Sequence, residues 1–139
     1  MKKRIEIKEI KKQDTILAFD TSNFLNLDDL NKTLKVFNQI VKDYDTNVTI
    51  ILFNDQIQMV FPINNCYELE DYVLPKSDFS DFNNLFKYIK EEIEPESHKI
   101  FKVFVITNEI KQSVEKTDLP VSWVSNIDLE IPFGELIKF

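Results

Sequence analysis

Three short clusters of hydroxyl and carboxylate side chains stand beside apolar runs and have the chemistry of an ion or partner site. They are Asp20 to Ser22, Ser77 to Asp81, and Thr107 to Glu109. In an open parallel sheet, the functional crevice lies beyond the carboxyl ends of the strands, where the strand order reverses. Hydroxyl and carboxylate oxygens gathered there are the hard ligands that magnesium or calcium prefers. We therefore expect the three clusters to meet at one edge of a sheet.

The apolar runs that must position these clusters predict a set of strands. Several runs are continuous and rich in branched side chains, as in strands that are buried on both faces. The predicted strands are Thr15 to Phe19, Asn47 to Phe53, Gln56 to Phe61, Ile100 to Ile106, Val121 to Val124 and Leu136 to Phe139. Asn54 and Asp55 suit a tight turn between the second and third strands, which predicts a hairpin.

Apolar residues that recur at steps of three and four predict helices between the strands. One stripe runs from about Leu27 to Tyr44, and another from Phe82 to Ile93 ends before Pro95. Ser80 is the expected N-cap of the second helix. A further short helix is predicted from Tyr67 to Val73.

Strands that alternate with amphipathic helices favour right-handed crossovers and a parallel sheet. We therefore predict a three-layer, Rossmann-like α/β fold with a mainly parallel central sheet, one antiparallel edge strand and helices on both faces. The expected domain covers residues 15–139, after a basic N-terminal extension at 1–14. The basic residues of this extension are Lys2, Lys3, Arg4, Lys8, Lys11 and Lys12.

Composition limits the classes of function. The chain has 139 residues, of which 43% are hydrophobic, enough for one continuous core. Its formal charge of −7 opposes binding to a phosphate backbone, so nucleic acid is not an expected partner. Cys66 has no second cysteine to pair with, which suits a reducing compartment. Since no long apolar run is present, we expect a cytoplasmic protein without a membrane partner.

Five landmarks in a fixed order resemble those of von Willebrand factor A domains, in particular the A-like domain that bacterial proteins carry beside a metallopeptidase-like region. The family motif Asp-x-Ser-x-Ser corresponds to residues 20–24, and Thr-Asp-Phe to 80–82, followed by Tyr-Ile at 88–89. Thr-Asp-Gly corresponds to residues 107–109. The last two, Pro-x-x-Trp-Val and Pro-Phe-Gly, are matched at 120–124 and 132–134. The resemblance covers about residues 15 to 139.

The departures from these motifs fall on positions that hold a cation in the family. Phe24 stands where the family has a serine, and it offers no oxygen. Asn108 replaces an aspartate, which removes a negative charge, while Ser80 replaces a threonine and keeps the hydroxyl. A divalent cation needs anionic as well as neutral oxygens. The resemblance therefore implies a degenerate metal site and no required cofactor, with magnesium or another divalent cation left as an alternative.

The leading hypothesis is a non-catalytic protein-interaction module, and the resemblance implies a ring-forming AAA ATPase as the first partner to test. The expected partner-binding residues are Asp20, Ser22, Phe24, Ser80, Asp81, Asn108 and Glu109. The first alternative is a metal-dependent ligand-binding domain in which Asp20, Ser22 and Ser80 hold the cation. In the leading hypothesis, which needs no metal, Phe24 presents an apolar contact at the rim of the site.

A second alternative is an enzyme. The run from Ile16 to Ser22 also resembles the opening of actin-like nucleotide-binding folds, but those folds need glycine-rich phosphate loops. The single glycine, Gly134, lies at the far end of the chain. The sequence also has no recognisable pair of nucleophile and base. His98 and Cys66 are interpreted as residues without a catalytic role, and Trp123 as a core residue.

Overall fold

The computed structural model describes residues 13–23, 27–41, 46–62, 77, 79–96 and 100–138. The strands are β1 (Gln13–Asp20), β2 (Thr46–Phe53), β3 (Ile57–Pro62), β4 (Ile100–Ile106), β5 (Val121–Ser125) and β6 (Glu135–Lys138). The longer helices are α2 (Leu27–Val41) and α3 (Phe82–Tyr88). A short helical turn, η1 (Thr21–Asn23), follows β1, while α3 continues as a π-helical turn, η3 (Ile89–Ile93), and a last turn, η4 (Glu94–Glu96). The helices predicted from Tyr67 to Val73 and beyond Val41 lie outside the described residues.

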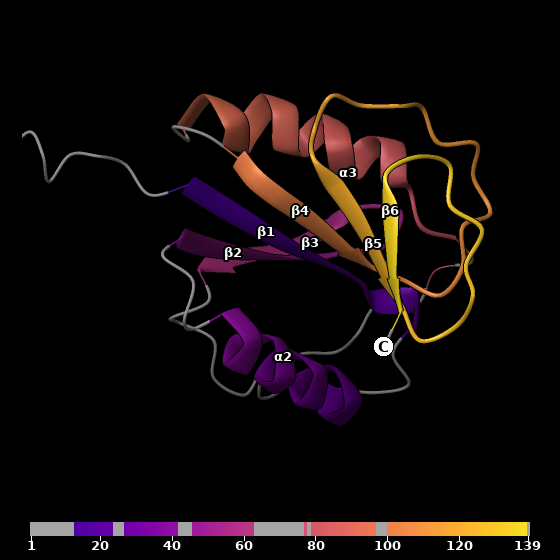
Figure 1. The fold of residues 1–139 in the computed structure, drawn as a ribbon, viewed down its shortest axis with the longest axis horizontal. Coiled ribbons are helices and arrows are strands. Elements are labelled where there is room, and N and C mark those ends of the chain that lie inside the picture. Colours follow the sequence, from indigo (N-terminus) through magenta and orange to yellow (C-terminus); the bar gives the residue numbers. More distant parts are fainter. Residues whose placement is uncertain are drawn as a thin grey trace, which may run out of the picture.

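The six strands form one sheet in the order β3-β2-β1-β4-β5-β6. Every neighbouring pair is parallel except β2 and β3, which are antiparallel. This confirms the predicted parallel sheet, its antiparallel edge strand and the hairpin that makes it. The order reverses at β1, because the chain first builds outward to β2 and β3 and then returns to the other side with β4. Figure 1 shows β1, β4, β5 and β6 ending at the same side of the molecule, beside η1.

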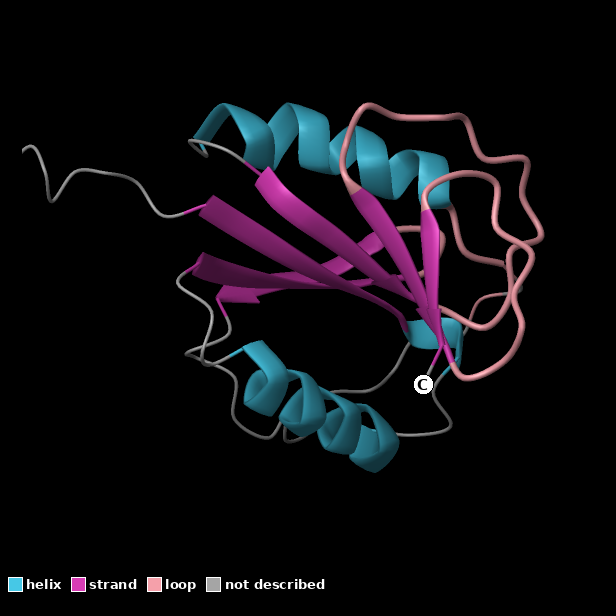
Figure 2. Ribbon diagram, viewed as in Figure 1, coloured by secondary structure: helices cyan, strands magenta, loops and turns pink. Residues whose placement is uncertain are grey.

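Helices cover both faces of the sheet, with α2 on one and α3 with its π-helical extension on the other (Figure 2). Alternate residues of β1 explain why. Ile16 and Ala18 belong to the core cluster under α3, whereas Leu17 and Phe19 belong to the cluster under α2. Since each of these side chains is fully buried, burial on both faces stabilises β1 by roughly 2 kcal/mol for each of the larger ones.

Trp123 of β5 is the centre of the core on the α3 side, as the sequence predicts. Its ring packs edge-on against Phe82 at 5.4 Å, Phe86 at 6.0 Å and Phe133 at 5.9 Å between centroids. The indole N–H donates to the Phe133 carbonyl at 2.8 Å, so its polar atom is satisfied in the interior. Gly134 follows with φ of +78°, a conformation that a residue with a side chain rarely adopts. None of the helices in the described part of the chain is long and apolar enough to cross a membrane.

Candidate functional site

Asp20 is the last residue of β1 and the centre of a buried polar cluster at the carboxyl edge of the sheet. Only 1% of its surface is exposed. Its Oδ1 accepts hydrogen bonds from the Ser22 hydroxyl at 2.6 Å and the Ser22 N–H at 3.1 Å. These two bonds arise because the chain turns sharply into η1, which brings the residue two positions later back onto the carboxylate.

Ser80 joins the same oxygen from another part of the chain. Its hydroxyl donates to Asp20 Oδ1 and lies 3.1 Å from the Ser22 hydroxyl oxygen. Ser80 is therefore part of the polar cluster, and the prediction that it is the N-cap of α3 is wrong. That role belongs to Asp81, whose side chain accepts from the Asn84 N–H at 2.9 Å. The one-residue displacement frees the serine hydroxyl to face the sheet.

Thr107, the residue after β4, completes the cluster; it belongs to one of the three polar clusters predicted from the sequence but is not among the expected partner-binding residues. Its hydroxyl donates to Asp20 Oδ2 at 2.7 Å, and the residue is buried. The register of the sheet places it there, because Phe19 of β1 lies opposite Ile106 of β4, the residue before it. The signal available in sequence was its place directly after the fourth strand, the same relation that Asp20 has to Phe19.

Asp81 and Gln112 form a second hydrogen-bonded unit beside the cluster. The Gln112 amide donates to Asp81 Oδ1 at 2.9 Å, and its oxygen accepts from the Phe82 N–H at 2.8 Å. The Asp81 N–H donates to the Asn54 carbonyl at 2.9 Å, which ties the start of α3 to the end of β2. The contacts of Asp81 thus fix the entry to α3 and hold the neighbouring Ser80 in place.

Asn108 and Glu109, which were also predicted as site residues, form contacts with residues other than Asp20. Asn108 Oδ1 accepts from the Ser125 hydroxyl at 2.6 Å, so this oxygen is directed to the end of β5. Glu109 is exposed and lies 3.7 Å from the Lys111 ammonium group. Phe24 lies outside the described residues, as do Cys66 and His98. The structure therefore brings together Asp20, Ser22 and Ser80 of the predicted set and adds Thr107.

The polar cluster is poor in negative charge for a divalent cation. Three hydrogen bonds from Ser22 and Ser80 reach Asp20 Oδ1, and one from Thr107 reaches Oδ2. The 3.1 Å between the two serine oxygens would suit neighbouring ligands of magnesium. The negative charge of the cluster is too small for a divalent cation, because Asp20 is its one carboxylate. No three acidic, cysteine or histidine side chains gather anywhere in the described residues. This donor set does not fit a cation site of the family type.

Some exposed apolar side chains are close in sequence to residues at the carboxyl edge of the sheet. Among the described residues, four large apolar side chains are exposed, namely Val60, Phe79, Ile127 and Ile137. Phe79, with 47% of its surface exposed, immediately precedes Ser80, and Ile127, with 45%, follows the end of β5. Ser22 is also exposed above the buried carboxylate. The carboxyl edge of the sheet thus presents Ser22 together with Phe79 and Ile127, while Ser80 and Thr107 are buried.

The molecule is a doubly wound α/β domain. Its polar cluster lies at the switch point, where the strand order of the sheet reverses. The family model described as VWA-like domain (DUF2201) matches residues 15–139, and the chain belongs to this family. No curated protein matches the chain in sequence. The crystal structure of the SpRpn10 VWA domain has a similar fold, with a TM-score of 0.53 and 10% sequence identity. The similarity covers 93% of this chain and 88% of that chain.

Proposed function

We propose that this chain is a non-catalytic protein-interaction module whose binding surface is the carboxyl edge of the sheet. The observation that carries the proposal is the composition of that edge. Phe79 is exposed and immediately precedes Ser80 of the hydroxyl cluster, Ile127 is exposed and follows the end of β5, and the buried Asp20 carboxylate fixes the cluster. Apolar side chains around a small polar centre supply both affinity and orientation at a protein interface.

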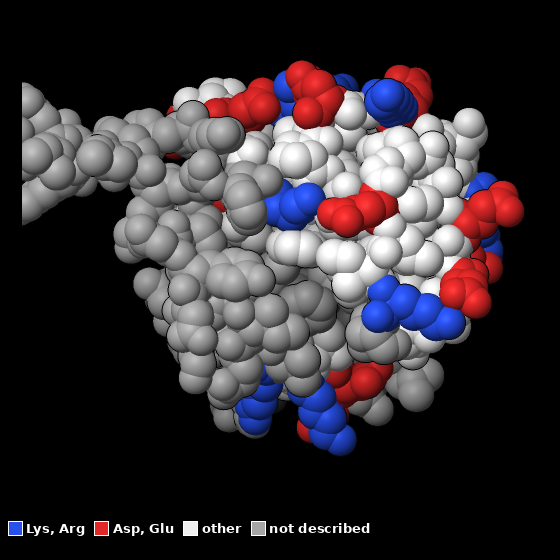
Figure 3. Space-filling view, viewed as in Figure 1, with Lys and Arg blue, Asp and Glu red and all other residues white. Residues whose placement is uncertain are grey.

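The chemistry of the cluster supports binding rather than catalysis. The three hydroxyl groups donate into the Asp20 carboxylate, which is buried. A serine nucleophile needs a base that is free to take its proton. Because Asp20 already accepts hydrogen bonds from these hydroxyl groups, it acts as a structural anchor that fixes the positions of Ser22 and Ser80. Over the described part of the face in Figure 3, basic and acidic side chains alternate, which does not favour binding to nucleic acid.

The family resemblance supplies the first partner to test, a ring-forming AAA ATPase. The experiment is affinity capture from the native cell with the full chain as bait, followed by mass spectrometry. The surface variant is Phe79→Asp/Ile127→Asp, which adds two negative charges to the apolar rim. Lys87→Gln/Lys116→Gln is the matched control, because it changes the net charge by the same amount at two exposed positions away from the rim.

We expect the wild type and the control to retain the same partner and the surface variant to lose at least about nine-tenths of it, while all three keep the same melting temperature. Recovery of an AAA ATPase among the lost proteins supports the specific partner. If the surface variant captures the same proteins as the wild type, the carboxyl edge is not the binding surface.

A further inference from the structure

A groove at the opposite end of the sheet is distinct from the site around Asp20. It has a volume of about 440 Å³ and lies between β3 and the π-helical extension of α3. Val60 and Pro62 of β3 line one side, and Tyr88 and Ile93 line the other. Asp14, near the start of β1, also lines it. Six residues separate Asp14 from Asp20 along one strand, which places the two sites about 20 Å apart.

The charged side chains that the described residues bring to this groove have one sign. They are Asp14, Glu92 and Glu96, and the described lining residues include no lysine or arginine. Glu92 and Glu96 are exposed, and neither forms an ion pair within the described part of the chain. A concave surface with apolar walls and carboxylates at its rim attracts a cationic group that carries an apolar stem.

The helix beside the groove has an unusual geometry that sets the position of these carboxylates. The Glu94 N–H donates to the carbonyl of Ile89, five residues earlier, which makes residues 89–93 a π-helical turn. Such turns are rare and occur frequently at functional sites. Glu92 lies on this π-helical turn and Glu96 on the 3-10 turn that follows it, and both line the groove. Alternate side chains of an extended segment point the same way and repeat at about 7 Å, so every second side chain of an added strand faces the groove.

The edge of β3 supplies the backbone for an added strand. In the described sheet, β3 is terminal, so one side of it has no neighbouring strand. Val60 is 39% exposed on the face toward α3, whereas Met59 and Phe61 pack with the core of the other face. An edge of this kind pairs readily with an extended segment of another chain. A strand added here would alternate between the acidic helix side and an apolar side.

We propose that this groove binds an extended segment of a partner protein in which lysine or arginine alternates with apolar residues, added as a further strand along β3. The cationic side chains extend over Val60 toward Glu92 and Glu96, and the apolar ones continue the face formed by Met59 and Phe61. The affinity comes from main-chain hydrogen bonds and the specificity from the two carboxylates.

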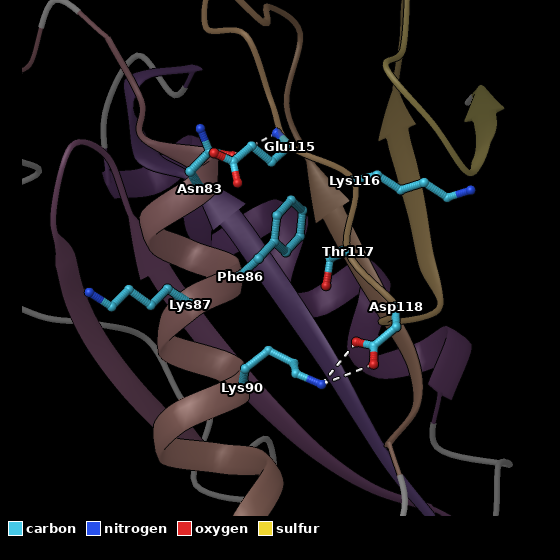
Figure 4. A pocket seen from close by; sticks show the side chains of 8 residues that line it. All are labelled: Asn83, Phe86, Lys87, Lys90, Glu115, Lys116, Thr117 and Asp118. Atoms are coloured by element: carbon cyan, nitrogen blue, oxygen red, sulfur yellow. Dashed lines mark hydrogen bonds and ion pairs between the residues drawn. The ribbon is translucent and has the colours of Figure 1, made fainter.

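A second pocket of about 360 Å³ lies between α3 and residues 115–118 (Figure 4). Its lining does not favour a cationic ligand. Its lining mixes lysines with acids, and Lys90 spans it by donating to the two Asp118 oxygens at 2.9 and 3.2 Å. These hydrogen bonds raise the pKa of Lys90 and lower that of Asp118, so both groups are charged and paired with each other. In this pocket Lys90 and Asp118 thus satisfy each other's charge.

The test measures binding of a fluorescein-labelled octapeptide that alternates lysine and valine to the full chain by fluorescence anisotropy. The same measurement uses an octapeptide that alternates glutamate and valine. The groove variant is Glu92→Lys/Glu96→Lys, and Glu91→Lys/Glu130→Lys is the matched control with the same change in net charge at exposed positions outside the groove. Hydrogen exchange of the β3 amides with and without the lysine peptide gives the location.

We expect the lysine peptide alone to bind, with a dissociation constant that rises at least about ten-fold in the groove variant and less than about two-fold in the control. Exchange of the β3 amides should slow on binding. The proposal is overturned if the wild type does not bind, if both variants lose affinity equally, or if β3 is not protected. The proposal is also overturned if the lysine peptide binds only after Lys8, Lys11 and Lys12 are changed to glutamine. In that case the occupant of the groove is the chain's own amino-terminal segment. The capture experiment with the Phe79→Asp/Ile127→Asp variant tests the carboxyl edge of the sheet, so its outcome does not affect the result for this groove.

Discussion

The Asp20 carboxylate accepts a hydrogen bond of 2.7 Å from the Thr107 hydroxyl, although 87 residues separate the two in sequence. Both residues are buried, and they stand at the carboxyl ends of the adjacent parallel strands β1 and β4. The contact joins the polar cluster to the sheet, because any displacement of β4 along β1 would break it. The rigidity of the candidate binding surface therefore depends on the register of the sheet.

Replacement of Asp20 by alanine should destabilise the fold strongly. The change leaves the hydroxyls of Ser22, Ser80 and Thr107 without their shared acceptor, and Ser80 and Thr107 are buried. We expect the free energy of unfolding to fall by about 2 to 4 kcal/mol. Urea denaturation followed by the fluorescence of Trp123 measures it. Asp55→Ala, at the half-exposed turn before β3, is the control and should cost no more than about 0.5 kcal/mol. Equal losses in the two variants would contradict the role given to Asp20.

Divalent cations should not stabilise the wild-type chain. Asp20 accepts four hydrogen bonds from Ser22, Ser80 and Thr107, and the family's second carboxylate is absent at Asn108. We expect the melting temperature to change by less than about 1 °C with millimolar magnesium, manganese or calcium. The variant Phe24→Ser/Asn108→Asp restores the missing oxygen and charge of the family motif, and it should gain a cation-dependent rise of about 3 °C or more. A comparable rise in the wild type would favour the metal-dependent alternative.

Alanine at position 134 should be poorly tolerated. Gly134 has φ of +78°, and an added Cβ would lie 2.6 Å from the carbonyl oxygen of Val121. That oxygen belongs to the backbone of β5, so the strand itself would have to move. We expect Gly134→Ala to lower the free energy of unfolding by at least about 2 kcal/mol, measured by urea denaturation. Pro132→Ala in the same exposed turn should cost less than about 1 kcal/mol. A similar cost for both substitutions would show that the turn relaxes.

The carboxyl group of Glu135 should titrate below its ordinary range. The Ser122 hydroxyl donates to Glu135 Oε2 at 2.7 Å, and this bond, followed by the Lys102 ammonium group at 3.2 Å, lowers the pKa. A lowered pKa in the folded state adds stability above the unfolded pKa, and the contribution is lost as the pH falls through the folded pKa. Ser122→Ala should raise the pKa of Glu135, measured by NMR titration of the side-chain carboxyl carbon. Lys102→Gln should raise it less. An unchanged value in Ser122→Ala would contradict the order of the two causes.

The sheet could be predicted from sequence because its strands carry their own signals. Ile100 to Ile106 is a strand over the predicted range, and the hairpin follows from Asn54, whose side-chain oxygen accepts from the Gln56 N–H at 3.0 Å to close the turn. The polarity and spacing of such segments depend on neighbouring residues alone. Parallel pairing of β1 and β4 then brings Asp20 and Thr107 to the carboxyl edge of the sheet.

The details of the site depend on contacts between distant segments, which local patterns do not specify. Ser80 and Asp81 are both good N-cap residues, and the choice of Asp81 depends on Gln112, which lies 31 residues away. Thr107 and Asn108 are adjacent, yet the first bonds to Asp20 and the second to Ser125. The groove beside Val60 depends on where the π-helical turn falls against β3, for which the sequence has no clear signal.

The shared acceptor of Ser22, Ser80 and Thr107 has a consequence for the protein during its synthesis. The ribosome releases the segment with Asp20 and Ser22 first, Ser80 about sixty residues later and Thr107 last, so a nascent chain lacks one donor of the cluster until β4 has emerged and paired. A partner that recognises the assembled edge can therefore bind only a chain that has completed its central strands, and it will ignore truncated products that end before this point.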